Sequence, residues 1–239
     1  MFFVGADVSK GKWLAVKLSE GESPEVRLFQ TIREIWDSYN AAGLVLIDMP
    51  IGLRDDGGEE RLCDKEARGL LGWPRRSSIF RAPCRATLKA SNYDDAKRIS
   101  IHRTSKSLPI QTWSIIPKIR EVDEFLNGNI SAKSRIREIH PELCFWALNG
   151  GKAMSCSKKT PEGISERTKV LRRACTQTDA VLKATKRDFQ GKVKDDDILD
   201  ALAAAVTAFL GRKRLLTIPE NPETDGSGLR MEMVYYRID

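Results

Sequence analysis

Near its C-terminal end the chain reads Lys194-Asp195-Asp196-Asp197-Ile198-Leu199-Asp200-Ala201-Leu202-Ala203-Ala204-Ala205-Val206-Thr207-Ala208. The pattern predicts a helix from Asp195 to about Leu210. Asp195 and Asp196 are typical of a first helical turn, because a carboxylate there accepts backbone N–H groups and suits the positive end of the helix dipole. Asp200 is different, because the helix after it is apolar on almost every side. Such a helix is buried against a sheet, and a buried carboxylate needs compensation.

Asp197 and Asp200 lie on one face of this helix, because residues three apart have Cβ atoms about 5–6 Å apart. Two carboxylates that close repel each other, which favours a bound cation. A hard cation with oxygen ligands, Mg²⁺ or Mn²⁺, fits best. The alternative is structural: Asp200 could cap a neighbouring loop.

Composition indicates one elaborated domain over residues 1–239, with a net charge of +7 from 40 Lys and Arg against 33 Asp and Glu. Positive charge around an acidic site suits a phosphodiester substrate. The five cysteines are odd in number and form no C-x-x-C pair. We therefore expect reduced thiols, and with no signal peptide or long apolar run, a soluble cytoplasmic protein without a membrane partner.

The first fifty residues predict three strands, a helix and a fourth strand, in that order. The expected ranges are Phe2–Ala6, Lys12–Leu18, Glu25–Gln30, Thr31–Tyr39 and Leu44–Ile47. A strand reached through a helix usually runs parallel to an earlier one, so the fourth strand can lie beside the first. Asp7 and Asp48, each expected just past its strand, would then meet where open α/β sheets place their sites. Each alone could also be an ordinary turn former.

Residues from about Leu53 to Leu126 are predicted to form a helical insertion outside the core of the sheet. An irregular basic loop within it offers forked and hydroxyl donors to phosphate oxygens. The expected substrate-binding residues are Arg75, Arg76, Ser77, Ser78 and Gln111, together with Lys10 and Lys118. The loops at 75–80 and at Lys158-Lys159 are expected to border the site.

A further strand is predicted over Arg135–His140, where Glu138 and His140 would share a face. One interpretation makes them a metal-binding carboxylate beside a base or phosphate donor, and thus catalytic. The other pairs Glu138 with an arginine and makes His140 the cap of the next helix. Residues 212–239 are expected to be a C-terminal extension, with a final edge strand over Met231–Ile238.

Several motifs together resemble an uncharacterised family, domain of unknown function four-two-nine, described as predicted RNase H-like nucleases. They are Gly5-Ala6-Asp7, Ile47-Asp48-Met49-Pro50-Ile51-Gly52-Leu53, Cys63-Asp64, Arg75-Arg76-Ser77-Ser78-Ile79-Phe80, Glu138-Ile139-His140-Pro141-Glu142 and Asp197-Ile198-Leu199-Asp200-Ala201. More distantly, the Asp-x-x-Asp-Ala-Leu-Ala helix resembles the last helix of the RuvC-type resolvases of the RNase H superfamily.

The resemblance implies an RNase H-like α/β fold: a mixed five-stranded sheet of order 3-2-1-4-5 with flanking helices and an insertion after the fourth strand. It places the catalytic, metal-binding acids at Asp7, Asp48, Asp197 and Asp200. In the resolvases the fourth-strand acid is usually Glu, where this chain has the shorter Asp48. The resolvase pattern does not account for Glu138 or His140.

These observations predict a metal-dependent nuclease. Two Mg²⁺ or Mn²⁺ ions about 3.5–4 Å apart would stabilise the attacking and leaving oxygens of a phosphodiester. One alternative is an actin-like ATP-dependent phosphotransferase, and another is a non-catalytic nucleic-acid-binding module. The expected partner is nucleic acid, DNA or RNA, with a homodimer as an open alternative.

Overall fold

A mixed five-stranded sheet forms the centre of the protein, whose computed structural model describes residues 1–56 and 58–238. The strands are β1 Phe2–Ser9, β2 Lys12–Ser19, β3 Glu25–Phe29, β4 Leu44–Ile47 and β5 Ile136–Glu138. Their order is β3-β2-β1-β4-β5, in which β1, β2 and β3 are antiparallel while β4 runs parallel to both β1 and β5. This confirms the predicted α/β fold, order and flanking helices.

The first strand is longer than its apolar run predicted. Lys10 and Gly11 have φ values of 47° and 80°, which makes a tight two-residue hairpin turn, so Ser9 still pairs with Lys12. Asp7 therefore lies inside β1, opposite Leu14, and not past its end. The pairing of β1 with β4, however, stops at Ala6 and Ile47.

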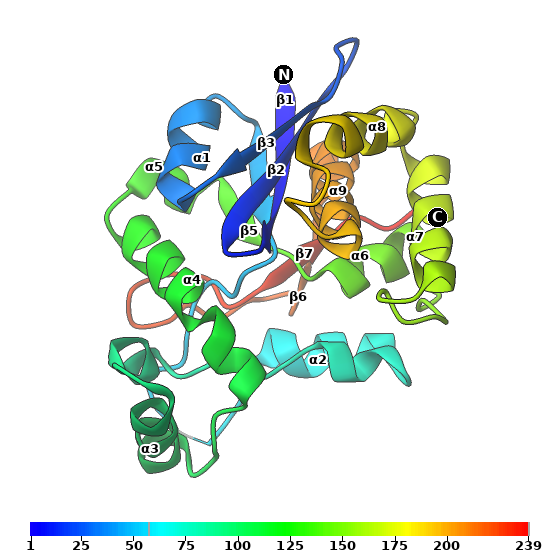
Figure 1. The fold of residues 1–239 in the computed structure, drawn as a ribbon. Coiled ribbons are helices and arrows are strands. Elements are labelled where there is room, and N and C mark those ends of the chain that lie inside the picture. Colours follow the sequence, from blue (N-terminus) through cyan, green and yellow to red (C-terminus); the bar gives the residue numbers. More distant parts are fainter. Residues whose placement is uncertain (57, 239) are drawn as a thin grey trace.

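One face of the sheet is covered by α9, Asp195–Leu210, as the sequence predicted. It packs on β1, β2 and β4, and α6 Pro141–Leu148, α7 Pro161–Ala174 and α8 Thr178–Phe189 lie around it (Figure 1). Gly5 makes this contact possible. A Cβ at Gly5 would lie 2.0 Å from the backbone nitrogen of Ala205 and 2.5 Å from the carbonyl oxygen of Ala201. The glycine and the alanines together let helix and strand approach closely.

The other face is covered by α1, Ile32–Tyr39, and by α4, Ile110–Asn127, which belongs to the inserted segment. Ile116, Ile119 and Val122 of α4 share one apolar cluster with the sheet. The prediction that the insertion lies outside the core is therefore wrong for α4. Pro117 does not interrupt this helix.

The rest of the insertion comprises α2 Leu62–Leu71, the 3-10 turns η1 Arg75–Ser78 and η2 Arg85–Lys89, and α3 Tyr93–Thr104. In Figure 1, α2 lies below the sheet, on the side toward which β1 runs from the N-terminus. A short helix, α5 Ile130–Lys133, then precedes β5. The insertion thus covers the end of the sheet where the predicted acids lie.

The C-terminal segment does not add a strand to the main sheet. After η3 Gly211–Lys213, β6 Leu216–Ile218 pairs with β7 Met233–Tyr235 as a separate two-stranded sheet. The predicted edge strand over Met231–Ile238 is thus shorter and pairs elsewhere. The five cysteines are all free thiols. Among the described residues, no helix is both long and apolar enough to cross a membrane.

Candidate functional site

The carboxylates of Asp7 and Asp48 meet at the point where the parallel pairing of β1 with β4 ends. The Asp48 backbone N–H donates to the carbonyl of Ala6 at 3.0 Å, which continues the ladder by one step. The carboxylate of Asp7 is buried and accepts the N–H of Val8 at 2.6 Å. Adjacent parallel strands therefore deliver the two acids to one place, as predicted from the sequence.

Asp200 joins them from α9 because this helix packs so closely on Gly5. Its side chain is 1% exposed. One carboxylate oxygen from each of Asp7, Asp48 and Asp200 lies within 4.8 Å of the others. We call these three residues the acidic triad. Asp197, the fourth predicted acid, is one turn away on α9 and is not part of this group of three.

Burial and mutual repulsion make the triad costly when it is fully charged. Burial, with repulsion from Asp200, raises the pKa of Asp48 to about 8. Burial raises the pKa of Asp200 to about 6, although the Lys158 charge opposes the increase. Burial, followed by the charges of Asp48 and Asp200, raises the pKa of Asp7 well above its ordinary range. A cation held among the three would offset this cost.

A cation of the protein itself already contacts the triad. The ammonium group of Lys158 lies 2.5 Å from an oxygen of Asp200 and 3.9 Å from one of Asp196. Asp200, Asp48 and Asp7 together raise the pKa of Lys158 against the effect of burial. The sequence predicted that the loop borders the site but did not identify Lys158 as a site residue. A lysine pair in a polar loop carries no signal that one member will reach a buried carboxylate.

Two features of the triad suit a hard divalent cation: the atoms that it offers as metal ligands, and the hydrogen-bond acceptors that it leaves unpaired. The possible metal ligands are all carboxylate oxygens, which Mg²⁺ and Mn²⁺ prefer. Within the described part of the chain, Oδ1 of Asp200 and Oδ2 of Asp197 are buried without a hydrogen-bond partner. Buried acceptors of this kind usually have a partner, which a metal ion or its water would supply. Asp7, Asp48 and Asp200 would hold the ion, with Asp197 alongside.

Glu138 and His140 are held by structural contacts. Arg61 of the insertion, 2% exposed, donates to both oxygens of Glu138 at 2.7 and 2.8 Å, and also to Asp64. Glu138 accepts the Ile51 N–H as well, at 2.6 Å. His140 is the N-cap residue of α6: its Nδ1 accepts the N–H of Glu142, and its Nε2 faces the carbonyl oxygen of Ser78.

These contacts match the second interpretation of Glu138 and His140, an arginine pair and a helix cap. They leave no oxygen of Glu138 and no ring nitrogen of His140 free of a protein partner, although both residues line the cavity described next. Burial lowers the pKa of His140 to about 4, so the ring is neutral at neutral pH. That Arg61 is the partner of Glu138 could not be predicted from the sequence.

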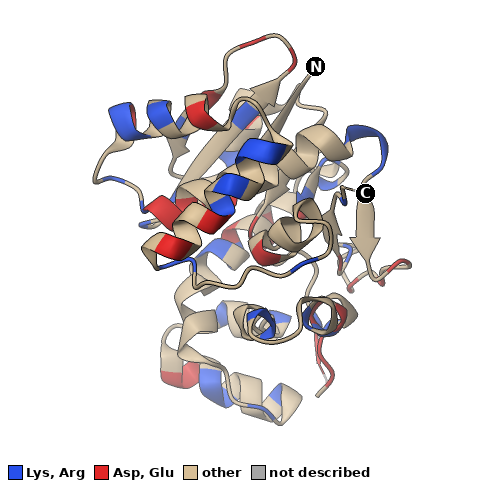
Figure 2. Cartoon of the chain, turned by 90° about the vertical axis from the view of Figure 1, so that its right-hand side faces the viewer, with Lys and Arg blue, Asp and Glu red and all other residues tan. Residues whose placement is uncertain are grey.

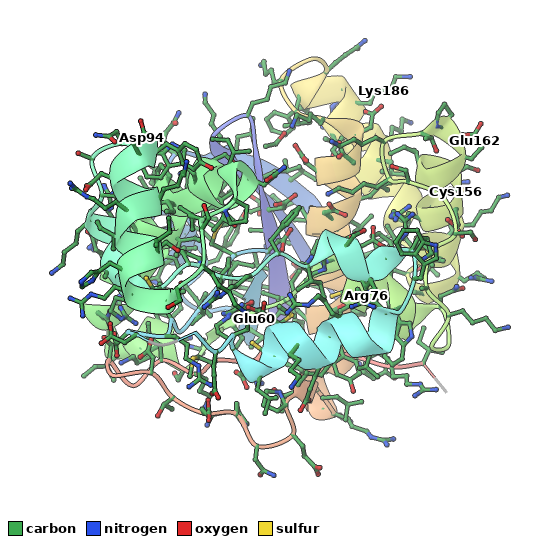
Figure 3. The ribbon with its side chains drawn as sticks, turned by 90° about the horizontal axis from the view of Figure 1, so that it is seen from below. Glu60, Arg76, Asp94, Cys156, Glu162 and Lys186 are labelled. Carbon is green, nitrogen blue, oxygen red and sulfur yellow. The ribbon has the colours of Figure 1, made fainter. Side chains whose placement is uncertain are left out.

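A cavity of about 520 Å³ opens above Asp7 and Asp48. The segment 75–80 and the Lys158-Lys159 loop both line it, which confirms their predicted position at the border of the site. Figure 3 looks at this end of the sheet, with α2 crossing it, α3 on one side and α7 on the other. The predicted substrate-binding residues that line the cavity are Arg75, Ser77, Ser78 and Gln111.

The other predicted substrate-binding residues are outside the cavity lining. Arg76 is exposed and does not line the cavity. Lys10 donates to the carbonyl of Gly191 at 2.6 Å. Lys118 donates to Gln30 and Glu121 at 2.7 Å each, so it helps to dock α4.

The sheet order and the acidic triad define an α/β protein with a carboxylate site where β1 and β4 separate. The chain belongs to the family described as Protein of unknown function (DUF429), whose model matches residues 5–224. The match confirms the family that the sequence motifs suggested. No curated protein matches the chain, and no solved structure matches it.

Proposed function

We propose that this protein is a metal-dependent nuclease that hydrolyses phosphodiester bonds of nucleic acid. One observation carries the proposal: carboxylates from β1, from the end of β4 and from α9 converge within 4.8 Å beneath a cavity with basic side chains. Bringing three acids together, two of them buried and Asp48 partly exposed, is costly without a cation. The cavity offers room for a substrate beside that cation, with basic side chains for its phosphates.

The cofactor of this proposal is Mg²⁺ or Mn²⁺, held by Asp7, Asp48 and Asp200. Such an ion would lower the pKa of a bound water and polarise a phosphoryl oxygen. Asp197 has an unpaired buried oxygen beside the triad and can accept a hydrogen bond from a water or complete the coordination.

The side chains around the cavity have separate parts in this proposal. Arg75, Lys159 and Gln111 line it and can donate to phosphate oxygens. The Ser77 hydroxyl donates to the carbonyl of Pro74, so it supports the turn and is free only to accept. His140 ties the Ser78 carbonyl to the start of α6, which keeps the η1 turn beside the acids.

The proposal is tested by incubating the protein with a mixture of labelled DNA and RNA oligonucleotides, with Mn²⁺, with Mg²⁺ and with EDTA. We expect metal-dependent cleavage by the wild type and none by Asp48→Asn. Asp94→Asn is the matched control, because Asp94 is an exposed acid at the start of α3, outside the cavity lining. Cleavage that persists in EDTA, or equally in Asp48→Asn, would contradict the proposal, as would intact oligonucleotides under every condition.

A further inference from the structure

The cavity above the triad has an apolar wall that a phosphate backbone alone does not need. Met49, Pro50 and Ile79 line it together with Ile115 and Phe80. A volume of about 520 Å³ is within the range of pockets that enclose a small organic molecule, roughly 300–1,000 Å³. The volume and the lining suit a planar, partly apolar group inserted beside the acids.

Phe80 is the side chain that most directly suggests what this group is. It lines the cavity and is nevertheless 51% exposed. A large aromatic ring left half in solvent beside this cavity offers a face for stacking. Base–aromatic stacking is the usual way in which proteins hold unpaired nucleotides, because every base has a π-face.

Basic side chains also line the cavity. Arg75 lines the cavity, and its Nε is buried without a hydrogen-bond partner among the described residues. The guanidinium of Arg75 can therefore donate to a phosphate oxygen of a ligand. Lys159 adds charge from the opposite loop.

We propose that the cavity receives one unpaired nucleotide, with its base against Phe80 and its backbone toward the acidic triad, so that the substrate is single-stranded nucleic acid. This inference rests on the proposed nuclease function. In a duplex the bases are stacked and paired, and a base would have to be extruded before it could enter the cavity. Single strands present their bases without that cost.

The test is binding of a fluorescent oligonucleotide, measured by anisotropy in EDTA, as a single strand and as a blunt duplex of the same sequence. We expect the single strand to bind at least about tenfold more tightly. Phe80→Ala should weaken single-strand binding about 5- to 150-fold, the range of one base stack, and leave duplex binding unchanged. Phe80→Trp should retain the affinity, whereas Phe80→Leu, which is apolar without a π-face, should not.

Leu70→Ala is the matched control. Leu70 is also a half-exposed apolar residue of the insertion, at 43%, but it does not line the cavity. Equal or tighter binding of the duplex, or unchanged single-strand binding by Phe80→Ala, would overturn the inference. Cleavage of the two forms in Mn²⁺ is measured separately. Single-strand binding that depends on Phe80, without cleavage, would support this inference and contradict the nuclease proposal. Preferential cleavage of the duplex would support the nuclease proposal and contradict this inference.

Discussion

Asp48 and Asp200 are equivalent as expected metal ligands but differ in their protein contacts. Asp200 accepts a hydrogen bond from Lys158, whereas the strongest influences on Asp48, apart from burial, are charges around it. Asp48→Asn should therefore leave the metal-free protein as stable or more stable, because it removes the free-energy cost of folding with a carboxyl group whose pKa is raised. Asp200→Asn should be the less stable of the two, because it also weakens the Lys158 pair.

Both variants should lose most of the increase in melting temperature that Mn²⁺ gives the wild type, because stabilisation by a ligand requires its site. Thermal melts with EDTA and with Mn²⁺ measure both effects. If either variant keeps the full Mn²⁺ shift, the metal is bound elsewhere. If Asp48→Asn is clearly destabilised in EDTA, Asp48 has a structural role instead.

Lys158 should compete with a metal ion for the triad, because its charge lies beside the same carboxylates. We expect Lys158→Met to bind Mn²⁺ roughly tenfold more tightly at pH 7.5, since removing one nearby positive charge favours a cation. Lys159→Met is the control, because it removes the same charge from the next residue, which is exposed and forms no ion pair with a carboxylate among the described residues. Titration calorimetry gives the two affinities. Weaker Mn²⁺ binding by Lys158→Met would mean that Lys158 supports the ion.

The two interpretations of Glu138 predict different effects of its substitution on stability and on the Mn²⁺ shift in melting temperature. Glu138→Gln should lose charge-assisted bonds to Arg61 and leave a buried donor facing the guanidinium, at a cost of about 1–3 kcal/mol. The Mn²⁺ shift in melting temperature should remain as in the wild type. A variant of normal stability that has lost the Mn²⁺ shift would instead make Glu138 a metal ligand.

At the scale of elements, the contact of α9 with β1 brings Asp200 to Asp7, and Gly5 controls it. Gly5→Ala places a methyl group 2.0 Å from a backbone atom of Ala205, which no side-chain movement can relieve. We expect the free energy of unfolding to fall by about 3 kcal/mol or more. Gly69→Ala is the control, because Gly69 lies in α2 with open space around its Cβ position and alanine favours the helix. Chemical denaturation compares them. A Gly5→Ala protein as stable as the wild type would show that α9 can move away from the sheet.

The elements that the sequence predicted well are those with strong local signals. Asp195–Leu210 combines acids in its first turn with a long apolar run, and its bounds agree with the structure. Asp7 and Asp48 could be placed together because a helix crossover implies parallel strands. The end of β1 was missed, because the hairpin turn at Lys10-Gly11 extends the pairing past the apolar residues.

Contacts between distant segments could not be predicted from local pattern. Arg61 reaches Glu138 across 77 positions, and Lys158 reaches Asp200 across 42. The sequence predicts that α4 lies outside the core with the rest of the insertion, because nothing local shows that it covers the sheet. In each case the tertiary fold, and not the neighbouring sequence, determines which residues are in contact.

At the scale of the whole molecule, basic and acidic side chains are arranged differently. In the view of Figure 2, Lys and Arg are distributed over several helices and are not gathered on one of them. The acids of the triad, in contrast, come from three elements to one place. In the proposed function, the net charge of +7 would supply a general attraction for nucleic acid, and the cavity would supply the specific site.

The buried acids also couple the stability of the whole molecule to pH. A carboxyl group whose pKa is raised on folding binds its proton more tightly in the folded state, so it stabilises at low pH and loses this effect as pH rises through the folded pKa. For Asp48 that pKa is about 8, and for Glu138 it is about 7. His140 acts in the opposite sense, but only below its ordinary value of 6.5.

We therefore expect the free energy of unfolding of the metal-free protein to fall between about pH 6.5 and pH 9, by at most ~1.4 kcal/mol per pH unit for each proton released. Asp48→Asn should flatten this slope, while Asp94→Asn should not. Because a metal ion competes with these protons, the stabilisation by Mn²⁺ should grow as pH rises over the same range. Urea unfolding in EDTA and in Mn²⁺ at several pH values measures all three. A metal-free protein whose stability rises over this range, or an Asp48→Asn slope equal to that of the wild type, would show that the triad does not carry the raised pKa values assigned to it.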